Sequence, residues 1–195
     1  MILGIDFGAK KAGSTVIATL TDENKVDFFI SEKNQDADQF INDVINRLDD
    51  VWSVYIDAPL SLPKTYSTPD QDGDFFYREA DKLTGAMSPM FLGGLTARAM
   101  KIKRELVKKG IKVVETYPGK LAKVLQLNEL EYKQDLEKLT ILCEKVKGMS
   151  GFSFECSAVK TWHHFDALLC LYSARRHEMQ SAMVFGKEDE GTITV

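Results

Sequence analysis

Short hydrophobic runs alternate with polar connections at the start of the chain. Apolar, β-branched and aromatic side chains dominate residues 2–7, 14–20 and 26–30, and residues 21–24 (TDEN) form a connection of the hairpin type. The pattern predicts three antiparallel strands.

A change of hydrophobic period follows. Within residues 36–50 the apolar side chains recur at spacings of three and four, which predicts an amphipathic helix. These side chains are Phe40, Ile41, Val44, Ile45 and Leu48. Residues 51–56 (VWSVYI) then predict a buried strand, which ends at Asp57-Ala58-Pro59 because a proline cannot donate to a sheet ladder.

The second half of the chain predicts further helices and one more strand. A basic helix over residues 95–109 ends at Gly110, and residues 111–116 predict a strand. Leu136, Leu139, Cys143 and Val146 mark one later helix, and a last helix is predicted over residues 161–176. Residues 183–185 and 192–195 are expected to pair as a terminal hairpin.

The order of elements predicts one α/β domain over residues 1–195, with an insertion at about 60–90. The 195 residues, of which 44% are hydrophobic, can fill a single core without disulfides. The insertion is rich in proline, glycine and polar residues, and we expect it to form a lid over the site described next.

Acidic residues stand at the ends of the predicted strands. A strand, a helix and a second strand make a right-handed crossover, so the strands that end near Asp6, Asp57 and Glu115 should be parallel and finish at one edge of the sheet. Asp166 lies beside the apolar face of the last helix, which can bring it to the same edge. Carboxylates so close need a compensating charge, and oxygen ligands favour Mg²⁺ or Mn²⁺.

Other polar residues near these acids are candidates for the same chemistry. His163 is a candidate for contacting the attacking water or the phosphate, although a histidine at a helix start often only caps or packs. Lys10, Arg78 and Lys120 are candidate phosphate contacts. The segment 98–112 contains seven basic residues and one acidic residue. These basic side chains form either a phosphate-binding face or an ordinary solvated surface.

The overall charge and the cysteines set limits on the partners and the compartment. A net charge of −4 argues against a protein that coats nucleic acid through its overall field. Three scattered cysteines without a CxxC pair fit reduced thiols, and no apolar run approaches the ~18 residues of a membrane span. These features predict a cytoplasmic chain without a membrane partner. No P-loop, dinucleotide-binding or hydrolase-elbow motif is present.

Short motifs spread along nearly the whole chain carry a family resemblance. The segments 2–8 (ILGIDFG), 55–59 (YIDAP) and 164–169 (HFDALL) resemble the ribonuclease-H-like superfamily. Further motifs resemble a narrower family of predicted ribonuclease-H-like nucleases, defined as a domain of unknown function. They are Leu62-Pro63, Arg78-Glu79-Ala80-Asp81, Tyr117-Pro118, Asp166-Ala167-Leu168 and Glu190-Gly191-Thr192-Ile193.

The resemblance implies a mixed five-stranded sheet, with its first three strands antiparallel, flanked by helices. In the wider superfamily, which includes Holliday-junction resolvases, acids on the first strand, the fourth strand and the last helix hold divalent metals. Carried onto this sequence they are Asp6, Asp57 and Asp166. The resolvases often have a glutamate where Asp57 stands and a second acid on the last helix, which is missing here.

The expected function is hydrolysis of phosphodiester bonds in DNA or RNA. Two other functions stay open. An actin-like ATPase shares the Asp-x-Gly after its first strand, but this chain would have to form a homodimer to close a cleft. The other is a binding scaffold that keeps the sheet without the chemistry.

Overall fold

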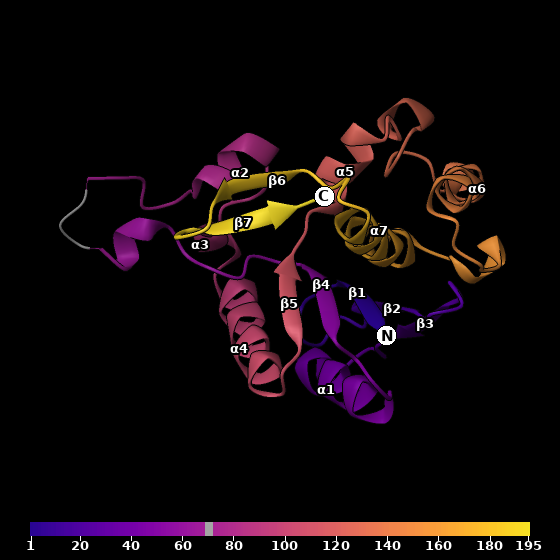
Figure 1. Ribbon diagram of the computed structural model, residues 1–195, viewed down its shortest axis with the longest axis horizontal. Coiled ribbons are helices and arrows are strands. Elements are labelled where there is room, and N and C mark those ends of the chain that lie inside the picture. Colours follow the sequence, from indigo (N-terminus) through magenta and orange to yellow (C-terminus); the bar gives the residue numbers. More distant parts are fainter. Residues whose placement is uncertain (69–71) are drawn as a thin grey trace.

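A computed structural model describes residues 1–68 and 72–195 (Figure 1). Its main sheet has five strands in the order β3-β2-β1-β4-β5. Their bounds are β1 Ile2–Asp6, β2 Val16–Leu20, β3 Val26–Ile30, β4 Ser53–Asp57 and β5 Lys112–Glu115. The first three strands are antiparallel, and β4 lies parallel to both β1 and β5, as the sequence predicts.

Helices cover both faces of this sheet (Figure 1). Their bounds are α1 Ala37–Arg47, α2 Glu79–Thr84, α3 Pro89–Leu92, α4 Gly94–Lys108, α5 Pro118–Val124, α6 Leu139–Ser150 and α7 Trp162–Glu178. Short 3₁₀ turns lie at Lys64–Tyr66, Asn128–Leu130, Leu136–Lys138 and Cys156–Ala158. The hydrophobic pattern predicts α1, α4, α6 and α7 to within a few residues, but it does not reveal α5 or the helices inside the insertion.

Side chains point alternately to the two faces of the sheet and so form two hydrophobic cores. Leu3 and Ile5 of β1 face α1 and α4, where side chains such as Ile41 and Ile102 complete one cluster. Ile2 and its neighbours on β2 face α5, α6 and α7, and they form the second cluster. The sheet is therefore buried on both sides, which leaves its carboxyl edge as the place for a site.

The chain ends in the predicted hairpin, β6 Val184–Lys187 paired with β7 Gly191–Thr194. This two-stranded sheet packs against α2, so the insertion is attached to the C-terminal segment (Figure 1). Glu190 strengthens the attachment, because its carboxylate accepts hydrogen bonds from the backbone N–H groups of Lys64 and Glu79. Among the described residues, no helix combines the length and apolar character needed to cross a membrane.

Candidate metal centre

Three aspartates meet at the carboxyl edge of the sheet. Asp6 and Asp57 are the last residues of β1 and β4, and the parallel register pairs them directly. Asp166 reaches the same place from the first turns of α7. One carboxylate oxygen from each residue lies within 4.8 Å of the other two. The predicted convergence of these three acids is therefore present in the structure.

A glycine on β1 allows α7 to approach closely enough for this arrangement. A Cβ atom on Gly4 would lie 2.4 Å from the carbonyl oxygen of Ala167 and 2.5 Å from the backbone nitrogen of Leu171. Such distances exclude any larger side chain unless the helix moves. Since Ala167 follows Asp166, the close contact at Gly4 fixes the height of the Asp166 carboxylate above the sheet.

The crowding of three carboxylates disfavours their ionised forms. Burial raises the pKa of Asp57 well above its ordinary value, and the charges of Asp6 and Asp166 raise it further. Burial also raises the pKa of Asp166 to about 6, although Lys133 lowers it. The charge of Lys133 lowers the pKa of Asp57, but the described residues form no hydrogen bond or ion pair with this carboxylate.

A histidine lies against Asp6 and can compensate the charge of its carboxylate. The Nδ1 atom of His163 lies 2.7 Å from Oδ2 of Asp6, and the hydrogen bond between them raises the pKa of His163. Its side chain is 51% exposed. The next residue, His164, is instead buried, bonds Thr161 at the helix start and packs on Phe28. The structure thus places His163 at the site, whereas His164 bonds the capping residue Thr161 and packs in the core.

Two further residues at the cluster escaped the sequence analysis. The hydroxyl of Tyr132 donates to Oδ1 of Asp166 at 2.5 Å, and Nζ of Lys133 lies 2.5 Å from Oδ2 of the same residue. Both belong to a polar segment between α5 and α6 that shows no hydrophobic period. No signal in the sequence connects this segment with Asp166.

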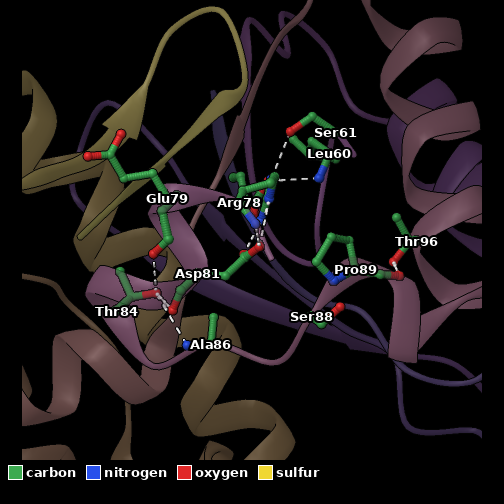
Figure 2. A network of polar contacts seen from close by, with 12 residues as sticks. Leu60, Ser61, Arg78, Glu79, Asp81, Thr84, Ala86, Ser88, Pro89 and Thr96 are labelled. Carbon is green, nitrogen blue, oxygen red and sulfur yellow. Dashed lines mark hydrogen bonds and ion pairs between the residues drawn. The ribbon is translucent and has the colours of Figure 1, made fainter. Parts of the chain in front are cut away.

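Figure 2 shows Arg78 and Asp81 in a buried network of polar contacts. Glu115 belongs to the same network through its ion pair with Arg78. The guanidinium of Arg78 makes paired contacts with both carboxylates, at 2.6 and 3.1 Å to Asp81 and at 2.5 and 2.8 Å to Glu115. It also donates to Ser61 at 2.8 Å, so all five of its N–H groups are used. The backbone N–H of Leu60 donates to Glu115 at 2.7 Å.

This network corrects two predictions. Arg78 is fully buried and has no donor left for a phosphate, so the expected phosphate contact is wrong. Glu115 does stand at the predicted sheet edge, but it holds Arg78 and does not join the three aspartates. The network joins the insertion to β5, because Arg78 precedes α2 and Glu115 ends that strand.

The remaining predicted cations make contacts elsewhere. Nζ of Lys10 lies 3.2 Å from Asp36 at the start of α1, and Nζ of Lys120 donates to the Leu83 carbonyl at 3.3 Å. On the basic helix α4, Arg98 pairs with Asp38 at 2.7 Å and donates to the Gly8 carbonyl at 3.2 Å. No contact brings these side chains to the aspartates, and their phosphate contacts stay predictions.

A cavity of about 210 Å³ opens beside Asp6 and Asp57. Apolar side chains form most of its wall, among them Phe7, Leu92 and Leu95, and the insertion adds Ala86 and Met87. The insertion therefore borders the acidic edge, as expected for the predicted lid. Part of it is fixed to β5 and to the terminal hairpin. Residues 69–71 of the predicted lid lie outside the described residues.

The donor set of the cluster fits a small divalent cation. Three carboxylates offer oxygen ligands only, and the described side chains form no hydrogen bond or ion pair with Asp57. Comparison of the chain with protein-family models and with curated proteins finds no match. The resemblance to ribonuclease-H-like nucleases accordingly stays a prediction.

Proposed function

We propose that this chain is a divalent-metal-dependent nuclease that hydrolyses phosphodiester bonds of nucleic acid. The observation that supports the proposal is the convergence of Asp6, Asp57 and Asp166 from two strands and a helix within 4.8 Å. Three acids this close destabilise a fold when all are ionised, unless cations or protons neutralise them. Their position at the ligand-binding edge of an α/β sheet favours a functional cation site.

Asp6, Asp57 and Asp166 would hold Mg²⁺ or Mn²⁺. When bound, such an ion polarises a phosphoryl oxygen and lowers the pKa of water, which supplies a nucleophile near neutral pH. The aspartates themselves position the ion and do not attack. Tyr132 assists by fixing the orientation of Asp166 through its 2.5 Å hydrogen bond.

His163 is suited to move a proton in this reaction. Its Nδ1 atom is held by Asp6, and its half-exposed ring leaves Nε2 for a proton from water or for the leaving oxygen. The hydrogen bond to Asp6 raises the pKa of His163 and so favours the protonated ring, which can donate a proton. The identity of the polymer, DNA or RNA, is the first property to measure.

The test is a cleavage assay with single-stranded and double-stranded DNA and RNA in Mg²⁺ or Mn²⁺. We expect cleavage that EDTA abolishes and that D6N reduces by about 100-fold or more, because one ligand of the ion is lost. The matched control is D49N, since Asp49 is exposed and lies outside the cluster. Both variants must keep the wild-type circular dichroism spectrum.

Two other results would contradict the proposal that this chain is a nuclease. Thermal stabilisation by ATP with Mg²⁺, without cleavage or stabilisation by any oligonucleotide, would favour a nucleotide-binding phosphotransferase. Neither cleavage nor stabilisation would favour a non-catalytic scaffold.

A further inference from the structure

The ammonium group of Lys133 lies within the acidic cluster. Its Nζ atom is 2.5 Å from Oδ2 of Asp166. The two partners differ strongly in environment, because the Lys133 side chain is 48% exposed and that of Asp166 only 3%. A positive charge from the protein itself thus covers one oxygen of a nearly buried carboxylate.

The other oxygen of Asp166 is also engaged, but by a neutral group. Oδ1 accepts the hydroxyl of Tyr132, which can stay in place when a cation binds the carboxylate. A second positive charge next to the Lys133 ammonium is opposed by direct repulsion. Of the two partners of Asp166, Lys133 is therefore the one that a divalent cation must displace.

The backbone holds Lys133 over the cluster. Glu131 and Lys133 adopt positive φ angles of 62° and 60°, which are uncommon for residues with a side chain. Between them, Tyr132 is buried against Trp162 and Phe165 of α7 and anchors the turn. The flexible lysine stem starts from this anchor, so a displaced ammonium stays close to the aspartates.

We propose that Lys133 is an exchangeable counter-ion of the aspartate cluster and, once displaced from Asp166 by a divalent cation, a phosphate-positioning residue of the nuclease. The proposal rests on the proposed function and adds a residue to it. It assigns the positive charge that the acidic edge needs to bind a polyanion, a role that Arg78 does not fill. Lys133 then contacts the anionic oxygens of the substrate while the aspartates hold the metal.

The first experiment measures binding of Mn²⁺ alone by isothermal titration calorimetry. The variants are K133M, K133R, D166N and the charge-matched control K123M, which removes an exposed lysine of α5. We expect K133M to bind Mn²⁺ about tenfold more tightly than wild type, since a partly exposed ion pair no longer competes. K133R and K123M should resemble wild type, and D166N should lose binding.

The second experiment measures binding of a short labelled oligonucleotide by fluorescence anisotropy in Ca²⁺. Here K133M should bind several-fold more weakly than K123M, and K133R should restore most of the affinity. Opposite effects of one substitution on metal and oligonucleotide distinguish the proposed role from a purely structural one. A loss of folding would instead lower both affinities and the melting temperature.

The outcomes separate this proposal from the proposed function. If wild type binds Mn²⁺ through Asp166 but K133M behaves like K123M in both assays, the role of Lys133 is wrong and the metal site stands. If neither wild type nor K133M binds Mn²⁺, both proposals are wrong. Tighter binding of Mn²⁺ and weaker binding of oligonucleotide by K133M would support both.

Discussion

Replacement of Asp57 by asparagine tests the electrostatic reasoning about the cluster without any substrate. Asp57 lies opposite Asp6 in the parallel ladder and near Asp166, and within residues 1–68 and 72–195 no hydrogen bond reaches its carboxylate. D57N keeps the shape of the side chain and removes its charge. In the absence of metal we therefore expect the variant to be more stable than wild type at neutral and higher pH.

The distances in the cluster set the size of the effect. Two unit charges 4.8 Å apart repel by about 3.5 kcal/mol at an effective dielectric constant of about 20. Protonation of one aspartate relieves part of this repulsion, so the expected gain in the free energy of unfolding is about 1–3 kcal/mol. For a chain of this length, that gain corresponds to a melting temperature raised by roughly 3–10 °C.

The gain should depend on pH in a defined direction. The pKa of Asp57 in the folded protein is raised above its unfolded value of about 3.9. The folded state therefore binds more protons than the unfolded state between these two pKa values, and wild type loses stability as the pH rises through that window. D57N removes this loss, so the two proteins should have similar stabilities near pH 4 and diverge toward pH 8.

Thermal melts in EDTA and in Mn²⁺ provide the assay, with D49N as the control. Mn²⁺ should stabilise wild type, by about 2.7 kcal/mol at 100 times the dissociation constant. D57N should lose most of that stabilisation because it lacks one ligand. The electrostatic interpretation is wrong if D57N melts at a lower temperature than wild type at pH 8 in EDTA. It is also wrong if Mn²⁺ raises the melting temperature of D57N as much as that of wild type.

Three further substitutions test neighbouring contacts. H163N should be less stable than wild type by about 0.5–1 kcal/mol at pH 5–6 in thermal melts, and this loss should disappear as the pH rises through the raised pKa of His163. A loss of stability that does not depend on pH would contradict the bond to Asp6. R78M leaves two buried acids without their partner and should cost about 3–5 kcal/mol in urea unfolding, whereas a cost below about 1 kcal/mol would show that the network is not buried. G4A should push α7 away at the Ala167 carbonyl, which lowers the free energy of unfolding by about 1–3 kcal/mol and weakens Mn²⁺ binding in calorimetry. Unchanged stability and unchanged Mn²⁺ binding would contradict the close approach of the helix.

The part of the site that lies on regular elements could be predicted from the sequence. Apolar runs defined β1 and β4, and the handedness of the crossover made them parallel, so Asp6 and Asp57 had to meet at one edge. Asp166 could be assigned to a long helix, but α7 is buried on all sides from His164 to Ala174, so the structure alone shows which way its carboxylate points.

The contacts that the sequence did not reveal depend on irregular segments. Arg78 stands in a polar stretch, and its burial results from partners at Ser61 and Glu115 that are distant in the chain. Lys133 lies on a turn whose position is set by the packing of Tyr132 against α7. Short helices such as α5 carry too few turns to show a clear period.

A crystal structure of the protein with Mn²⁺, located by its anomalous signal, would show whether the three aspartates bind one ion. We expect Mn²⁺ bound by oxygen atoms of Asp6, Asp57 and Asp166, with the Lys133 ammonium no longer in contact with Asp166. An ion found at another place, with the three aspartates still unliganded at saturating Mn²⁺, would contradict this expectation.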